Sequence, residues 1–359
     1  MTQELNTPTL SPTPVRLVDI ARRANVSRTT VAKVILQSAG ENARVSTKTA
    51  MRVRQVADEM GYRPNLTAQR LAGKQSKIIG ITIDTYAPTP SYQQLAEMER
   101  FASEAGYRVM VGQMHDDLSK LNDYMLDFKS SGVDGVICIS HDYPGIHRQV
   151  VRLMQGFENV VFVGKTAIDR SKVCWAAPDH ETAQCNIVSH LVEQGKKRIV
   201  LGIGNTKHRS HIERRKGYRD GLEASNLPYD PDLVFNISDT CEGLALPDHQ
   251  SPLTVLLKEK WEHLKFDAII TSNDVIALYV IRAIETMGLC VPDDVAVTGY
   301  DNLPMAHLTK PAITTVDLCN HDLAQASIDL LIRQIQGKTI RGKAKHRNII
   351  PKLIIRQST

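Results

Sequence analysis

The chain has 359 residues, 42% of them hydrophobic, which is enough to bury a sizeable core in two or three compact units. No run approaches the ~20 consecutive apolar residues of a membrane-spanning helix, so we expect none. Residues 1–14 are polar and rich in Pro and Thr, without the basic and apolar stretches of a secretion signal. We therefore expect a disordered lead-in over 1–14 and a cytoplasmic protein.

Positive charge is concentrated in the N-terminal part of the chain. Residues 1–76 hold 12 Lys and Arg against five Asp and Glu, which leaves 32 basic and 34 acidic residues for the rest. A small basic module on a near-neutral body is typical of a protein that binds a polyanion, although a solvated basic face has the same charge pattern. The six cysteines have no CxxC spacing, which favours reduced thiols in the core.

Residues 15–64 have the spacing of three short helices. Apolar residues recur at helical intervals over 17–24, 28–36 and 47–60. Ser27 and Ser46 stand at the expected N-caps of the second and third helices, and Gly61 follows the third. Two helices joined by a tight turn, the second of them basic, predict a helix-turn-helix DNA-binding domain. A three-helix bundle without a ligand shares this spacing.

The second helix is expected to enter the major groove. Arg28, Thr29 and Lys33 are its outward positions, where Arg can pair with guanine and Thr can meet a thymine methyl. Ser27 and Thr30 lie near the helix N-terminus, where backbone N–H groups favour phosphate contacts. One such domain covers only a half-site, so we expect a homodimer on a near-palindromic operator in double-stranded DNA.

From residue 77 onward, short β-branched runs alternate with longer amphipathic segments, which predicts βαβ units and largely parallel sheets. The expected strands cover 78–84, 107–113, 135–140, 160–164, 198–202, 268–272 and 295–300. The expected helices include 93–105, 181–194, 212–225 and 274–287. A segment of this length exceeds what one sheet usually holds, so we expect two doubly wound parallel-sheet lobes over 77–359.

Three stretches near the N-terminus carry a family resemblance: LVDIARRANVSRTTVAKVI, RVSTKTAMRVRQVADEMGYRPN and LTAQRLAGKQS. They resemble the DNA-binding head of the lac repressor (LacI/GalR) family of bacterial transcription regulators. The resemblance implies a hinge helix and linker over 65–76, with Leu71 wedged into the minor groove at the operator centre. The expected DNA contacts also include Arg16, Ser46, Tyr62 and Asn65.

A few head positions depart from the family's usual residues. Ala32, Lys33 and Leu36 stand where relatives usually have Ser, Arg and Asn, and Arg16 replaces a usual Thr. The 37–44 loop is longer than in most members. The architecture of the head therefore carries over, whereas the operator sequence does not.

The resemblance extends through the body in the stretches SGVDGVI, HLVEQGKKRIVLG, ERRKGYRDGL, DAIITSNDVIAL and DVAVTGYDN. Such bodies resemble periplasmic sugar-binding proteins, in which two lobes joined by three crossover strands enclose a ligand. The resemblance places Arg214, Asn273 and Asp301 in the effector pocket, with Asp84 and Tyr92 across it. Independently, Asn273 and Asp301 directly follow predicted strands, and ligands bind beyond the carboxyl ends of parallel strands. These side chains suit a small polar effector such as a sugar or a related metabolite.

Several of these positions have a structural alternative. Arg214 could form a surface salt bridge, Asp301 could be a turn residue, and Asp274 could only cap its helix. Trp175 fits either a stacking wall for a sugar ring or a core aromatic residue.

Two short signals bear on the ligand. Gly164 stands where several sugar-responsive relatives carry Asp, and Lys165 follows it, so the effector could carry an anionic group. His208 and His211 have the spacing of a metal site but no evident Cys or carboxylate partner, which favours a solvated loop.

No motif of a known catalytic centre is present. The chain lacks GxxxxGKS/T, GxSxG and HExxH, so we expect neither an enzyme nor a cofactor or metal. The expected function is a transcriptional regulator, most simply a repressor, associated with the nucleoid and controlled by a small effector. The alternative function is a solute-binding protein without a DNA role, against which the helix-turn-helix argues.

Overall fold

The computed structural model describes residues 15–36, 45–62, 75–115, 117–139, 142–143, 145–166, 173–204, 207–241 and 247–359. The chain divides into two compact units, residues 1–76 and 77–359. The expected lead-in, the 37–44 loop and the hinge positions Asn65 and Leu71 lie outside the described residues. In the described ranges, no helix is long and apolar enough to cross a membrane.

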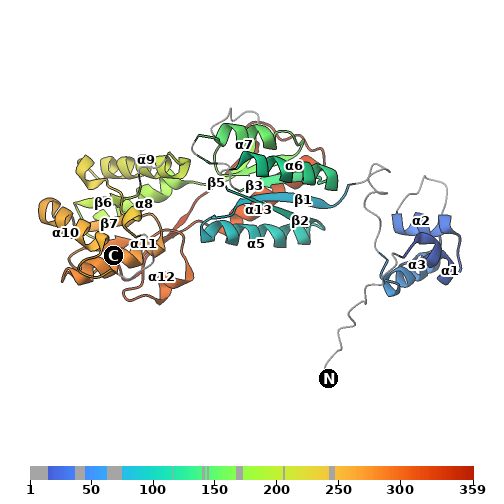
Figure 1. Ribbon diagram of the computed structural model, residues 1–359, viewed down its shortest axis with the longest axis horizontal. Coiled ribbons are helices and arrows are strands. Elements are labelled where there is room, and N and C mark those ends of the chain that lie inside the picture. Colours follow the sequence, from blue (N-terminus) through green and yellow to red (C-terminus); the bar gives the residue numbers. More distant parts are fainter. Residues whose placement is uncertain are drawn as a thin grey trace, which may run out of the picture. The chain divides into compact units, whose positions relative to one another are not determined.

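The N-terminal unit consists of three short helices around a small apolar core (Figure 1). They are α1 (Leu17–Arg23), α2 (Arg28–Leu36) and α3 (Thr47–Glu59). Ser27 Oγ accepts the N–H of Thr30 at 3.0 Å, and Ser46 Oγ accepts that of Thr49 at 3.2 Å. Both serines therefore cap the helices that follow them, as the sequence predicts. The core contains one apolar face of each helix, represented by Ile20, Val31 and Val53.

The first lobe of the body is built on a six-stranded parallel sheet with the order β10-β5-β4-β3-β1-β2. The strands are β1 (Ile78–Asp84), β2 (Arg108–Met114), β3 (Gly135–Cys138), β4 (Val160–Val163), β5 (Cys174–Pro178) and β10 (His346–Ile349). One face is covered by α5 (Thr89–Glu104) and α13 (Asn320–Ile335). The other face is covered by α6 (Leu118–Ser131) and α7 (His147–Met154). The sheet is therefore buried on both sides, as parallel sheets usually are.

The second lobe is built on a three-stranded parallel sheet, β6-β7-β8. These strands are β6 (Ile199–Gly202), β7 (Ala268–Thr271) and β8 (Ala296–Thr298). One face is covered by α8 (His180–Glu193) and α9 (Arg209–Ala224), and the other by α10 (Pro252–Leu264) and α11 (Asp274–Thr286). A short helix and an antiparallel strand pair complete the lobe: α12 (Pro304–Leu308), β9 (Thr315–Asp317) and β11 (Lys352–Ile354).

The chain passes between the two lobes three times. The crossings follow β5, lie between β9 and α13, and lie between β10 and β11 (Figure 1). The expectation of a helical head and a body of two doubly wound lobes is confirmed. Because the segments after the parallel strands of both sheets face each other, polar side chains at those strand ends can meet.

Candidate functional site

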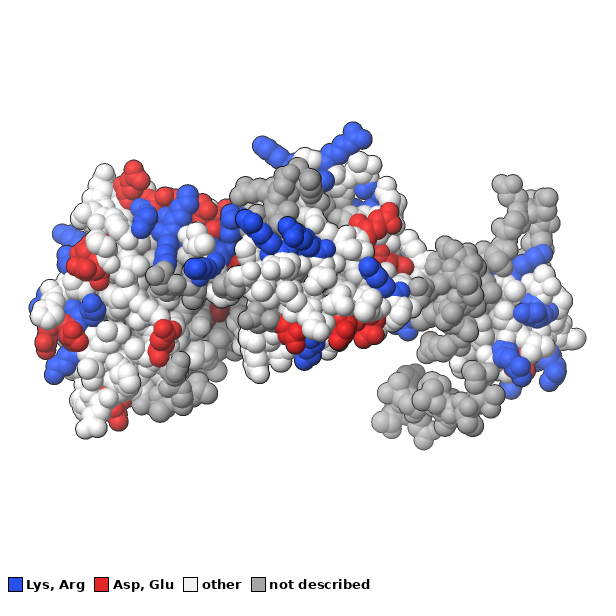
Figure 2. All heavy atoms as spheres, turned by 45° about the horizontal axis from the view of Figure 1, so that its top comes forward, with Lys and Arg blue, Asp and Glu red and all other residues white. Residues whose placement is uncertain are grey.

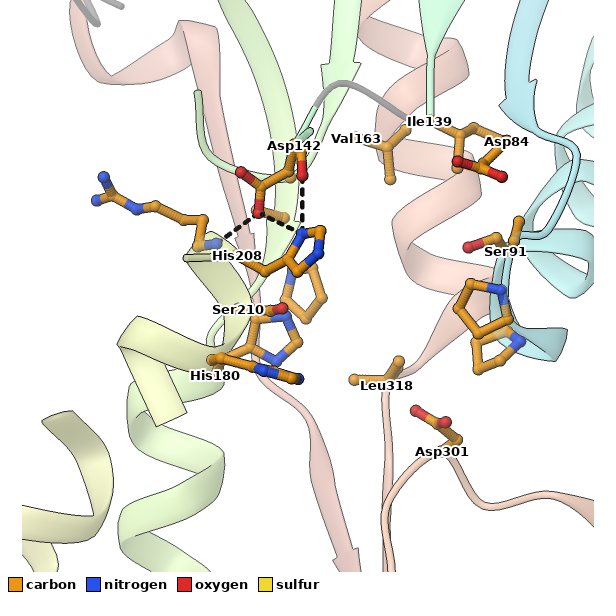
Figure 3. A pocket seen from close by; sticks show the side chains of 18 of the residues that line it. Asp84, Ser91, Ile139, Asp142, Val163, His180, His208, Ser210, Asp301 and Leu318 are labelled. Carbon is orange, nitrogen blue, oxygen red and sulfur yellow. Dashed lines mark hydrogen bonds and ion pairs between the residues drawn. The ribbon is translucent and has the colours of Figure 1, made fainter. Parts of the chain in front are cut away.

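A cavity of about 600 Å³ lies between the two lobes of the body. Its lining comes from segments that follow β1, β3, β4 and β5 in the first lobe and β6, β7 and β8 in the second. The volume is within the usual range for a small-molecule site, and the position beyond the strand ends is where α/β sheets bind ligands. Figure 3 shows side chains of both lobes pointing into this space.

Four of the five expected effector-binding residues line the cavity: Asp84, Arg214, Asn273 and Asp301. Tyr92, the fifth, is not part of the lining. Its hydroxyl lies instead 3.0 Å from the backbone carbonyl oxygen of Thr85, to which it donates a hydrogen bond. Tyr92 thus fixes the loop after β1 and has no place on the cavity wall.

Arg214 is held rigidly at the base of the cavity. It is buried, and its guanidinium donates to Gln184 Oε1 at 3.2 Å and to the carbonyl oxygens of Thr271 and Ser272 at 2.7 and 2.9 Å. The guanidinium also stacks on the Tyr300 ring at 4.0 Å. The surface salt bridge considered from the sequence is therefore wrong. Since an arginine has five N–H donors, these contacts leave two for a ligand.

Asp301 is both a turn residue and a cavity residue. Its φ is +96°, and its backbone N–H donates to the carbonyl of Val316 at 2.9 Å. Its carboxyl group has no hydrogen-bond partner among the described residues and borders the cavity. Burial raises the pKa of Asp301 to about 7, although the Arg214 guanidinium opposes this shift. A carboxyl group poised in this way can accept or donate a hydrogen bond to a ligand hydroxyl.

Asn273, and not Asp274, caps helix α11. Asn273 Oδ1 accepts the N–H of Ile276 at 2.9 Å, which leaves its amide N–H groups for the cavity that it lines. Asp274 is fully buried and accepts from the N–H of Leu303 at 2.6 Å and from the Thr315 hydroxyl at 2.5 Å. Burial raises the pKa of Asp274 to about 6. The capping role considered for Asp274 is therefore wrong, because its carboxylate ties three segments of the second lobe together.

Four histidines line the cavity that sequence reasoning did not place there: His115, His180, His208 and His211. The prediction of a solvated loop is wrong for His211, which lies in α9, whereas His208 does precede that helix in a loop and its side chain is 41% exposed. His180 Nδ1 lies 2.8 Å from the Tyr300 hydroxyl oxygen. Burial, with the nearby Arg214 charge, lowers the pKa of His180 to about 3 and that of His211 to about 4. Both imidazoles are therefore neutral at pH 7. No group of three or more His, Cys, Asp or Glu in the described ranges could hold a metal ion.

The cationic Lys165 is already paired. Its Nζ lies 3.1 Å from Glu213 Oε2, and Arg209 Nε lies 3.0 Å from the other oxygen of that carboxylate. The cavity lining as a whole carries four carboxyl groups and three lysine or arginine groups. An anionic effector thus finds no unpaired lysine here. Gly164 has φ +108°, a conformation in which an aspartate would be strained.

Trp175 is a core residue. It lies in β5, is buried in the core on the α6 and α7 side of the first sheet, and stacks on the His346 ring at a centroid distance of 4.6 Å. It is not part of the cavity lining. Of the two roles that the sequence left open, the core aromatic is correct.

The head offers a basic surface around α2. Arg28 and Thr29 are exposed, and Lys33 is partly exposed one turn later. The hydroxyl oxygens of Ser27 and Thr30 lie 2.9 Å apart, so their first role is to cap the helix. Residues 15–36 and 45–62 hold eight basic and three acidic side chains. Basic side chains predominate on the face of the head that Figure 2 shows.

The remaining head positions differ in exposure. Arg16 is exposed, and its backbone N–H donates to the Asp19 carboxylate at 2.9 Å at the start of α1. Ser46 is exposed at the start of α3. Tyr62 is half-buried against the head core, and burial raises the pKa of its hydroxyl. The chemistry of this surface suits contacts to phosphate and base edges.

Both units of the chain match known protein families. Residues 16–65 match the family described as "Bacterial regulatory proteins, lacI family", and residues 188–359 match "Periplasmic binding protein-like domain". The chain is 28% identical to the ribose operon repressor of Halalkalibacterium halodurans over 343 residues, covering 95% of this chain and 96% of that one. It is 27% identical to the HTH-type transcriptional regulator DegA of Bacillus subtilis over 364 residues, covering 96% and 97%.

Solved structures of relatives share the architecture of the whole chain. The lac repressor dimer bound to operator and the anti-inducer ONPF is 26% identical, with a TM-score of 0.77 and coverage of 96% of this chain and 99% of that one. The lac repressor bound to ONPG in the repressed state is 25% identical, with a TM-score of 0.76 and coverage of 97% and 100%. The chain thus joins a head that matches the lacI family of bacterial regulatory proteins to a body that matches a periplasmic-binding-like domain, and it resembles LacI-family transcription regulators over nearly its whole length.

Proposed function

We propose that the protein is a repressor that binds a near-palindromic operator as a homodimer and responds to a small polar effector in the cavity of its body. The observation that carries this proposal is the combination, in one chain, of a lacI-family head with an interlobe cavity bordered by Arg214, Asn273 and Asp301. One relative, the lac repressor, was solved as a dimer on operator with an anti-inducer. In this proposal, the present protein binds DNA in the cytoplasm and needs neither a catalytic step nor a cofactor.

The domain organisation follows from the same proposal. Residues 15–64 form the DNA-binding domain and 65–76 form a hinge helix and linker, in which Asn65 and Leu71 approach the minor groove. Arg16, Ser46 and Tyr62 contact the DNA backbone or lie beside it. The body over 77–359 binds the effector and holds the dimer together.

The chemistry of the cavity favours a neutral, hydroxyl-rich effector such as a sugar or a related metabolite. Arg214 and Asn273 retain N–H donors, and the Asp301 carboxyl group has no partner among the described residues. Lys165 is neutralised by Glu213, so this lysine does not favour an anion. Directional donors and acceptors around a partly apolar wall are typical of sites for polar metabolites.

Two measurements test this function. A thermal-shift screen of neutral sugars against sugar phosphates should find a stabilising compound among the neutral set, since a ligand at 100 times its Kd stabilises by about 2.7 kcal/mol. A gel-shift assay on genomic fragments should then show a retained fragment whose affinity changes with that compound. Stabilisation by compounds without retention of any fragment would favour the solute-binding alternative.

A further inference from the structure

The N-terminal half of α9 makes an ion pair with the opposite lobe. Glu213 of α9 accepts a hydrogen bond from Lys165, which follows β4 in the first lobe, over 3.1 Å. The Lys165 and Glu213 side chains are 12% and 4% exposed. Arg209, one turn earlier in α9, donates to the second oxygen of the Glu213 carboxylate at 3.0 Å. A largely buried ion pair therefore crosses from one lobe to the other.

Helix α9 also receives its N-terminal cap from the opposite lobe. His208, the residue at the N-cap position, makes no side-chain cap bond. The Asp142 carboxylate of the first lobe instead accepts the backbone N–H of Arg209 at 2.5 Å, and its backbone carbonyl lies 2.8 Å from His208 Nδ1 (Figure 3). A carboxylate at a helix N-terminus satisfies an unpaired N–H group and interacts favourably with the helix dipole. Separation of the lobes would leave α9 without this cap.

We propose that Asp142, Lys165 and Glu213 form a latch between the lobes that regulates access to the cavity. All of its contacts join protein groups, so closure does not require a ligand to bridge the lobes. A ligand then shifts an equilibrium between open and closed bodies that already exists. Because the latch would regulate the effector site, this inference rests on the proposed function. The opening of the lobes can nevertheless be measured without effector or DNA.

The energetics of the ion pair make the latch testable by a double-mutant cycle. Glu213→Gln leaves the Lys165 ammonium desolvated without a carboxylate, which is strongly unfavourable in the closed body. Lys165→Met removes the attraction between the lobes but leaves Glu213 paired with Arg209 of its own helix. Each single variant should therefore favour the open body, Glu213→Gln the more strongly. Replacing both partners with apolar side chains of similar size removes the desolvation penalty and can restore the closed body.

The test is an interlobe distance distribution measured by pulsed electron resonance on the full chain without effector. Spin labels are introduced as unnatural amino acids at Asp127 in α6 and Lys258 in α10, both exposed, so the native cysteines stay unchanged. An excess of unlabelled chain suppresses distances between protomers. Glu213→Gln should raise the open-to-closed ratio by about tenfold or more, and Lys165→Met should raise it by less because Glu213 keeps Arg209 as a partner. The double variant Lys165→Met/Glu213→Leu should return toward the wild-type ratio.

The controls separate the latch from a general loss of structure. Asp220→Asn removes an exposed ion pair with Lys216 on the same helix and within the same lobe, and should leave the distances unchanged. Asp142→Asn weakens the cap without removing an acceptor and should open the body less than Glu213→Gln. An unchanged distribution in both single variants, or a double variant as open as the singles, would overturn the proposal. Neither result touches DNA binding or effector identity, which the retention and thermal-shift assays decide.

Discussion

The substitution Asp301→Asn isolates one carboxyl group at the cavity wall. Asp301 combines burial, no hydrogen-bond partner for its carboxyl group among the described residues, and a pKa raised by that burial to about 7. Its φ of +96° would strain most replacements, but asparagine tolerates positive φ better than other side chains. The variant therefore removes the ionisation with little change of backbone or volume.

The expected magnitude follows from the pKa difference. The pKa rises from 3.8, the value expected in the unfolded chain, to about 7 in the folded protein. Three pKa units at about 1.4 kcal/mol each set an upper limit of about 4 kcal/mol on the amount by which this one carboxyl group lowers the free energy of unfolding above pH 7. Between pH 4 and 7 the folded wild type keeps a proton that the unfolded chain has lost. Its stability relative to Asp301→Asn therefore falls as pH rises through this window and levels off above pH 7.

Urea unfolding at several pH values between 4 and 8 measures this difference. The chain has two tryptophans, Trp175 and Trp261, and both lie in the body, so their fluorescence reports its unfolding without a contribution from the head. His180 and His211 titrate in both proteins and drop out of the subtraction. The variant should be the more stable protein at pH 8, and the two should converge near pH 4. A difference that is independent of pH, or that grows toward acid, would refute the reasoning.

Three further predictions concern the head, the cavity and the packing of α9. Arg28→Ala should weaken operator binding by about 1–3 kcal/mol and relax base preference in competition gel shifts. For the wild-type protein, log K for operator binding should fall by about 0.9 per neutralised phosphate for each unit of log salt concentration. Arg214→Lys should abolish ligand binding in calorimetry while basal DNA binding persists, because a lysine cannot reproduce the planar, several-fold hydrogen bonding of the guanidinium. Gly217→Ala should cost about 1–3 kcal/mol in urea unfolding, since an added Cβ would lie 2.2 Å from the Glu181 carbonyl oxygen, whereas exposed Asp220→Ala on the same helix should cost less than about 0.5 kcal/mol.

The local pattern of apolar and β-branched residues was sufficient to predict much of the fold. The β-branched run at 78–84 predicts β1 with its observed bounds, because five of its positions are buried and none of these five is charged. β5 and β10 were missed. β5 reads CWAAP and lacks β-branched residues, and β10 reads HRNI and is largely polar. These two strands pair with each other across more than 160 residues of sequence, which no local window contains.

Residues of the candidate site could be predicted from the sequence where they directly follow a strand. Asn273 and Asp301 directly follow expected strands, and that position alone brings them to the cavity. The histidines were missed because their environment depends on distant partners: His180 meets Tyr300, and His208 meets Asp142. Tyr92 was placed wrongly in the pocket because the helix was expected to begin at 93, whereas α5 begins at Thr89 and includes Tyr92 in its first turn.

The central claim is that ligand in the cavity controls DNA binding by the head. Its most direct test is the affinity of the full chain for a retained genomic fragment, measured by fluorescence anisotropy with and without the compound that stabilises the body. We predict a change of at least about fivefold, the lower end of typical coupling between two sites, and its loss in Arg214→Lys with unchanged affinity in the absence of compound. An affinity that stays the same at saturating compound in the wild-type protein would contradict the account.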